Sequence, residues 1–175
     1  ETNYLNYSQI EEAWEQSKGD GVRIAIMDWS FKSKGKSQKK YVDPVSVVDD
    51  EQIGDMKPWH GEWMAEIAHL VAPEAKIIPI RTNSLKTRTF QGNIAKAIRY
   101  AADHGATVIT SSMGELKYTD EIKEAIDYAE SKGMVFVDVH PEFIAQEDGT
   151  YKEGDLTNCD PRIIHAGIVS VPDHK

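Results

Sequence analysis

The sequence has one cysteine, fewer basic than acidic residues and no long apolar run. Cys159 alone can neither close an intramolecular disulfide nor form a cysteine-based zinc site, so the redox compartment stays open. No segment approaches the run of about 18 apolar residues that a membrane-spanning helix needs. The net charge is −9, and the lysines of 31–40 are scattered along a single short stretch. Nucleic-acid backbones are bound by clustered Lys and Arg, so this composition argues against that function.

Length and apolar content are those of one folded domain. A chain of 175 residues with 40% hydrophobic residues can bury a core without disulfides or a structural metal. We therefore expect residues 1–175 to form a single domain.

Short runs rich in Val and Ile alternate with amphipathic helical patterns along the chain. The runs are bounded by glycine or by polar clusters, as buried strands are. The helical patterns repeat apolar residues three and four positions apart; Thr119 can cap one of them, and Gly105 and Gly133 end two. The predicted strands are 21–28, 75–81, 106–111, 133–140 and 162–171. The predicted helices are 60–71, with apolar positions at Met64, Ile67, Ala68 and Val71, then 91–104, 119–132 and a short surface helix at 11–16.

This alternation predicts an α/β fold with three layers, in which helices cover both faces of a mostly parallel sheet. Ligands of such sheets bind at the carboxyl ends of the strands. The residues that follow the strands are therefore candidates for the site, at 28–30, 82–84, 111–114 and 140–142. Two regions do not fit the alternation. Residues 31–40 contain five lysines and are predicted to be an exposed loop, and residues 143–161 are predicted to be a long polar loop.

Asp28 and His60 are the first candidates for catalysis. A carboxylate that bonds one imidazole nitrogen fixes the tautomer and leaves the other nitrogen as a general base. Each residue also has an ordinary alternative, since a strand-end Asp can hold a metal or phosphate and a His at a helix start can be a cap. A receiver-like domain would use Asp28 for Mg²⁺ or a phosphoryl group, but no adjacent acid or glycine-rich loop supports it. A metal hydrolase is weaker, because His60 and His69 lack ligand spacing on one helix face.

Five blocks of sequence resemble the subtilisin-like serine peptidases, the subtilases, in the order and approximate spacing of that family. The first follows Ala13-Trp14 and reads GDGVRIAIMDWS, and the second reads HGEWMAEIAHLVAPEAKIIPIR. The others are IAKAIRYAADHGATVITSSMG, IKEAIDYAESKGMVFVDV and the predicted strand that begins near Ile163. The match runs from about Ala13 to Val171, which is almost the whole chain.

The resemblance implies a subtilisin-like fold that stops before the helix bearing the family's serine. It implies that Asp28 is the carboxylate and His60 the general base of an Asp-His-Ser triad that cleaves a peptide or protein substrate. Ser112, Met113 and Gly114 would line a cleft in which an extended peptide pairs as an added strand, with 83–90 at its other edge. The resemblance favours a secreted or extracellular location. It implies no cofactor, although calcium is possible at a site that the sequence does not identify.

The chain also departs from the family pattern. The family's Gly-Thr-Ser motif is missing, since Gly149-Thr150 is followed by Tyr151. Glu142 stands where the family has its oxyanion asparagine, and an ionised carboxylate there would repel the developing charge. Trp29-Ser30 replaces Thr/Ser-Gly after Asp28, and Glu62-Trp63 replaces Thr-His after His60-Gly61. We expect these neighbours at the entrance to the site.

Two explanations account for these departures. The chain is either the N-terminal part of a serine endopeptidase whose nucleophile lies in another segment, or a catalytically inactive pseudo-peptidase that binds proteins or peptides. In both cases the sheet should expose apolar surface beyond its last predicted strand. This predicts a homodimer or a tightly bound C-terminal segment.

Overall fold

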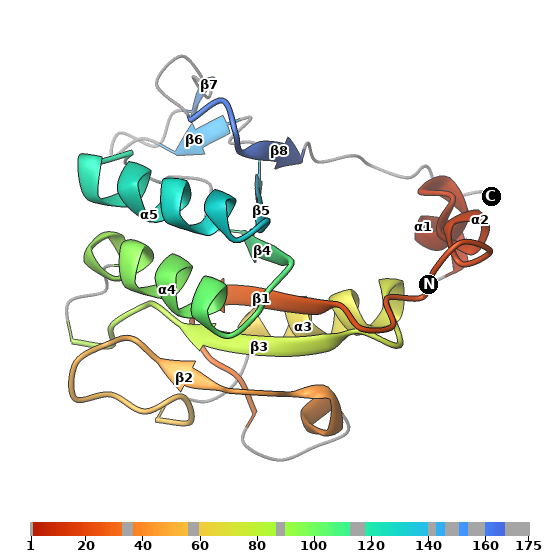
Figure 1. The fold of residues 1–175 in the computed structure, drawn as a ribbon, viewed down its shortest axis with the longest axis horizontal. Coiled ribbons are helices and arrows are strands. Elements are labelled where there is room, and N and C mark those ends of the chain that lie inside the picture. The colour runs from red at the N-terminus through yellow and green to blue at the C-terminus, as the bar shows by residue number, and fades with distance from the viewer. Residues whose placement is uncertain are drawn as a thin grey trace.

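The structure is a computed structural model of residues 1–175 that describes residues 2–32, 37–55, 60–86, 90–112, 118–139, 143–145, 151–153 and 160–166. Its centre is a six-stranded sheet in the order β2-β3-β1-β4-β5-β8, in which every neighbouring pair is parallel (Figure 1). The predicted α/β fold with a mostly parallel sheet is confirmed. The strands are β1 (Arg23–Asp28), β2 (Val45–Ser46), β3 (Lys76–Arg81), β4 (Val108–Ser111), β5 (Val135–Val139) and β8 (Ile164–Ala166).

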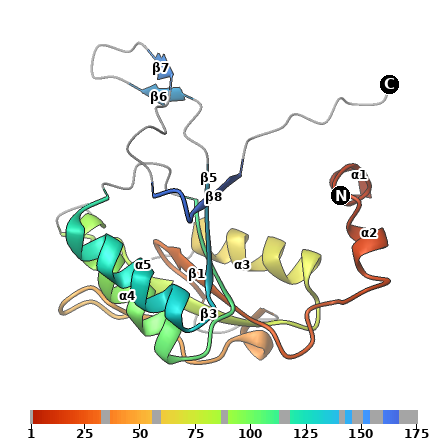
Figure 2. The ribbon, with the colours of Figure 1, turned by 45° about the horizontal axis from the view of Figure 1, so that its top comes forward.

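The helices lie on both faces of this sheet, as the two views show (Figures 1 and 2). The N-terminal segment adds two short helices, and Trp14 Nε1 ties it to the end of α3 by donating to the Val71 carbonyl at 2.8 Å. The helices are α1 (Thr2–Tyr7), α2 (Ile10–Ala13), α3 (His60–Val71), α4 (Gln91–Asp103) and α5 (Asp120–Ser131), with a 3₁₀ turn at Ser37–Lys40.

The larger part of the core lies between the sheet and α4 and α5. Alternate residues of β1 point to opposite faces, so Ala25 and Met27 belong to this part and Ile24 and Ile26 to the other. The caps follow the sequence prediction: Thr119 accepts a bond from Ile122 N–H at 3.4 Å at the start of α5. Other large side chains in this part of the core are Ile78, Ile80, Ile94, Ile98, Ile109, Ile122, Ile126 and Phe136.

The opposite face of the sheet is covered by α3, which packs across β1 and β3. Small residues make this contact close. A Cβ added to Gly61 would lie 2.5 Å from the Ser30 carbonyl oxygen and 3.0 Å from the Asp28 Cβ. Ala65, one turn further along α3, is fully buried against Ile26 and Ile77.

The close contact turns larger apolar residues of α3 outward, which corrects the predicted apolar face. Ile67 and Val71 were expected among its apolar positions, yet their side chains are 53% and 39% exposed. Together with Trp63 and Leu70 they form the outer stripe of α3. The reason is steric, since only small side chains fit where the helix meets the end of β1.

Both regions that were predicted to be loops contain regular structure or buried residues. Phe31 was expected in an exposed loop but is completely buried beside Ala65, and Ser37–Lys40 is a 3₁₀ turn. Within 143–161, Phe143–Ala145 (β6) and Tyr151–Glu153 (β7) pair as a small antiparallel sheet. The alternation rule missed it because each strand has only three residues.

We expect Gly61→Ala to destabilise the chain and Gly92→Ala to stabilise it. The first substitution forces a methyl group into the Ser30 carbonyl and should cost about 1–3 kcal/mol. The second lies in α4, where an added Cβ meets nothing within 4 Å, so the helical preference of Ala should add up to about 1 kcal/mol. Urea unfolding measures both. Equal effects at the two glycines would contradict a close contact at Gly61.

Candidate active site

Asp28 is the last residue of β1 and its side chain is only 1% exposed. One carboxylate oxygen, Oδ1, accepts the Trp29 backbone N–H at 2.6 Å. The other, Oδ2, lies 2.8 Å from Nδ1 of His60, which is 32 residues away in the chain. The two candidates that the sequence singled out are therefore in direct contact at the carboxyl edge of the sheet.

His60 is the first residue of α3, and its side chain is about a third exposed. Because Nδ1 bonds the carboxylate, Nε2 is the nitrogen available to exchange a proton with a reacting group. The contact depends on the following residue, since only glycine at position 61 lets the first turn of α3 approach Ser30. A buried acid that holds a partly exposed imidazole can act as a general-base pair.

Burial raises the pKa of the Asp28 carboxyl above its ordinary value, and bonds from Trp29 N–H and attraction from His60 oppose that rise. Burial of this carboxyl therefore makes its ionisation costly in folding free energy. Such a cost is common where a charged group is kept for chemistry.

The residues next to this pair do not all lie at an entrance, as the sequence had suggested. Trp63 is largely exposed and Trp29 is half-buried, but Glu62 is 1% exposed and points into the protein. Its carboxylate accepts bonds from the Lys32 backbone N–H at 2.8 Å and the Tyr41 hydroxyl at 2.7 Å. The expectation for Glu62 was wrong because donors on two separate segments converge on it.

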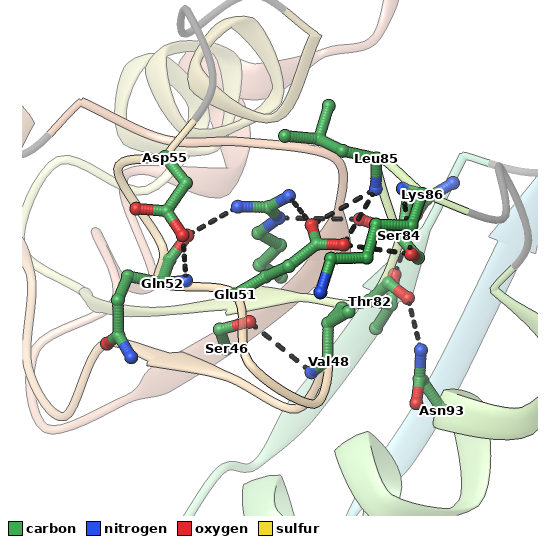
Figure 3. A network of polar contacts seen from close by, with 12 residues as sticks. Ser46, Val48, Glu51, Gln52, Asp55, Thr82, Ser84, Leu85, Lys86 and Asn93 are labelled. Carbon is green, nitrogen blue, oxygen red and sulfur yellow. Dashed lines mark hydrogen bonds and ion pairs between the residues drawn. The ribbon is translucent and has the colours of Figure 1, made fainter.

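A second buried charge pair lies beside Asp28 at the end of β3. Arg81, the register partner of Asp28, is fully buried and ion-paired with Glu51, and its Nη1 also donates to the Gln52 carbonyl. Burial would raise the pKa of Glu51, but bonds from Leu85 N–H and Ser84 and the charge of Arg81 together hold that pKa below its usual value. Figure 3 shows Glu51 surrounded by Ser84, Leu85 and the loop at Gln52.

This network holds the segment after β3 against β1. Thr82 N–H donates to the Asp28 carbonyl at 2.9 Å, and Asn93 of α4 donates to the Thr82 carbonyl at 2.8 Å (Figure 3). Ser84 Oγ and Leu85 N–H donate to Glu51 at about 3 Å. The segment expected to form one edge of a cleft, 83–90, is therefore fixed at 83–86, whereas 87–89 lie outside the described residues.

The other expected edge of the cleft is described only at Ser112. This exposed residue follows β4, and its Oγ lies 3.3 Å from the sulfur of Met64 on α3. Met113, Gly114 and Glu142 lie outside the described residues. The structure thus brings Ser112 to the helix that carries His60, and the roles suggested for these four residues stay predictions.

Sequence reasoning missed three buried acids at this edge of the sheet. Nothing in the sequence indicated that Glu51 and Glu62 are buried, because their partners are distant in the chain. Asp138 could have been noticed as an acid inside the apolar run of β5, where it is 2% exposed and aligned with Ser111. Its Oδ1 accepts the Val139 N–H at 2.9 Å.

Within the described part of the chain, no group of three or more His, Cys, Asp or Glu side chains is placed to hold a metal ion. None of the helices described there has the length and apolar character needed to cross a membrane.

We expect Asp28→Asn to raise stability near neutral pH. A carboxyl whose pKa is raised in the folded state contributes stability that is fully present below its unfolded pKa and is lost as the pH rises through its folded pKa. Asn stays neutral, so it avoids the free-energy cost of keeping a buried carboxylate ionised. Urea unfolding from pH 3 to pH 8 should show a gain at pH 7 that shrinks as the pH falls through the raised pKa of Asp28 and is gone below pH 3.8. The exposed Asp20→Asn is the control, and an Asp28→Asn variant less stable than the parent at pH 7 would refute this prediction.

The chain that carries Asp28 and His60 is similar to known proteins of one family. A sequence model of the Subtilase family matches residues 5–138. Thermitase from Thermoactinomyces vulgaris is 31% identical over 140 residues, which cover 74% of this chain and 50% of thermitase. Fervidolysin from Fervidobacterium pennivorans is 26% identical over 148 residues, 73% of this chain and 21% of that protein. The chain thus spans half or less of the length of these relatives.

Solved structures agree at the level of the fold. MycP1 with its N-terminal propeptide removed superposes with a TM-score of 0.65 at 23% identity, over 82% of this chain and 49% of MycP1. A lanthipeptide protease gives 0.67 at 17% identity, over 94% of this chain and 55% of its own. Because the family model matches more than half of its residues, the chain belongs to the subtilase family.

Proposed function

We propose that this chain supplies the acid and the base of a peptide-bond-cleaving site whose serine comes from outside residues 1–175. The observation that supports the proposal is the 2.8 Å contact between Asp28 Oδ2 and His60 Nδ1. The pair sits at the end of the central strand β1, where a parallel sheet places its reactive groups. The family match makes peptide or protein the expected substrate.

In the proposed reaction, His60 Nε2 takes the proton of a serine hydroxyl as its oxygen attacks the peptide carbonyl carbon. The same nitrogen then returns the proton to the leaving amine, and water repeats the cycle on the acyl-enzyme. Asp28 accepts the Nδ1–H throughout, so it fixes the tautomer and stabilises the imidazolium. Its burial strengthens that interaction, because little water screens it.

The proposed substrate lies extended between the segment after β3 and the segment after β4. Glu51 holds Ser84 and Leu85 in place through three bonds near 3 Å. On the other side, Ser112 is exposed next to Met64, one turn from His60. A peptide between the two segments would pair with their backbone groups as an added strand, and the reacting carbonyl would face His60.

Exposed apolar side chains on the α3 side of the sheet support the proposal of a further segment that carries the nucleophile. On the α3 side of the sheet, Val135 of β5 and Ile164 of β8 are 42% and 56% exposed. The outer stripe of α3 (Trp63, Ile67, Leu70 and Val71) adds exposed apolar side chains on the same side of the sheet, and a three-layer fold normally covers such surface. We propose that a further segment of the subtilase domain, or else a second copy of the chain, covers it.

A non-catalytic binding role is the second candidate. The observation in its favour is the sequence position of Glu142, because an acid at the family's oxyanion position opposes the developing negative charge. In this alternative the cleft still takes an extended peptide, and Asp28 and His60 persist without turnover. A secreted location stays a prediction under both functions.

Reaction with a fluorophosphonate probe distinguishes the two functions. We expect no labelling of the 175 residues alone, and labelling when they are joined to the coding sequence that follows Lys175. His60→Ala in the joined protein should slow labelling by about a thousandfold or more, because the serine loses its base. A joined protein that stays unlabelled would favour the binding role. Labelling that does not depend on His60 would exclude it as the base.

Light scattering coupled to size-exclusion chromatography tests the apolar area. We expect the chain alone to elute as more than one copy, because several large apolar side chains on the α3 side are exposed. Ile67→Glu places a charge within the outer stripe and should shift the chain toward one copy. Tyr7→Glu alters an exposed aromatic residue of α1 and should have no effect. A parent chain that runs cleanly as a monomer would contradict the proposed cover.

A further inference from the structure

Glu62 is a buried acid that the proposed reaction does not use. It lies in the first turn of α3, two residues after His60, and its side chain is 1% exposed. Its Oε2 accepts the Lys32 backbone N–H at 2.8 Å and the Tyr41 hydroxyl at 2.7 Å. The ammonium group of Lys32 lies 3.8 Å from the other oxygen, Oε1. The carboxylate thus bonds a segment that is remote in sequence and begins just after Asp28.

The contacts of the first turn of α3 follow one another along this segment. His60 bonds Asp28, Gly61 contacts Ser30, and Glu62 bonds Lys32. The stretch 28–32 is therefore attached to the first turn of α3 at both of its ends, and these attachments set the distance between the Asp28 carboxylate and the His60 imidazole. Asp28 itself is held by the sheet, so without the last bond it is the start of α3, with His60, that would lose one of its attachments to the chain after β1.

We propose that Glu62 is a positioning residue, which holds residues 28–32 against the start of α3 and so keeps Asp28 in contact with His60. A catalytic use of the aligned pair rests on the proposed function. The alignment of Asp28 with His60 does not rest on it, and this alignment can be measured in the absence of any catalytic turnover.

A carboxylate suits this place for two physical reasons. A single oxygen can accept two bonds, and here it takes both the Lys32 N–H and the Tyr41 hydroxyl. A negative charge in the first turn also meets the positive end of the helix dipole and the Lys32 ammonium, which offset the cost of burying it. If the carboxylate were removed, the Lys32 N–H would lose its acceptor inside the protein.

The test follows the proton on His60 Nδ1 by NMR in the full chain. This proton is protected from exchange with water only while Nδ1 stays bonded to Asp28. We expect Glu62→Ala to lose the resonance and to speed hydrogen exchange of the Lys32 amide by roughly tenfold. Glu62→Gln keeps a carbonyl oxygen that can accept both bonds, so it should restore the resonance.

Glu66→Ala is the matched control, because Glu66 lies one turn further along α3, is exposed, and also pairs with Lys32 at 3.5 Å. It should leave the resonance unchanged. If Glu62→Ala does not fold, Tyr41→Phe removes one bond to the same oxygen and should weaken the resonance while the fold remains.

Two results would overturn the proposal. One is a folded Glu62→Ala chain with the Nδ1 proton intact, and the other is equal loss of that proton in Glu62→Ala and Glu66→Ala. Failure of the proposed function is seen separately, as absent labelling of the extended protein by the fluorophosphonate probe while the His60 resonance responds as expected.

Discussion

The close approach between the first turn of α3 and the end of β1 is the contact on which the rest of the site depends. Asp28 is fixed by the sheet, since its strand is hydrogen-bonded on both sides, whereas His60 is fixed by a helix that must reach that strand. The approach is possible because position 61 has no side chain. A helix held further away by one methyl group would leave the imidazole beyond hydrogen-bond distance of the acid.

Charges gather at this edge of the sheet in unusual number for a protein interior. Asp28, Glu51, Glu62 and Arg81 are all buried, and each transfer from water costs free energy unless bonds replace the lost hydration. For the three acids, backbone N–H groups take the place of the lost water. Trp29 N–H donates to Asp28, Lys32 N–H to Glu62 and Leu85 N–H to Glu51. Each donor belongs to a segment that follows a strand. The buried acids therefore order the segments that surround the candidate site.

The sequence predicted the layers of the fold well and the details of the site unevenly. Strands and helices follow from hydrophobic period and capping, which are local, so β1, β3, α4 and α5 lie within a few residues of their predicted ranges. Asp28 and His60 could be paired because parallel strands present their carboxyl ends at one edge. The roles of Glu51 and Glu62 could not be predicted, because their donors come from segments 21 to 34 residues away. The orientation of α3 was missed for a related reason, since packing against Ser30 rather than hydrophobicity decides which face turns inward.

The two faces of the sheet also differ in a way that bears on function. Two helices pack on one face and complete a continuous core, while α3 leaves its outer stripe and the nearby side chains of β5 and β8 exposed. The contacts of Asp28 with His60, of Gly61 with Ser30 and of Glu62 with Lys32 are nevertheless made by residues outside that stripe. The acid and the base are thus aligned by contacts that do not involve the exposed apolar area. A segment that packs there would meet a base already in position, so the proposed site can be completed by docking without rearrangement of α3.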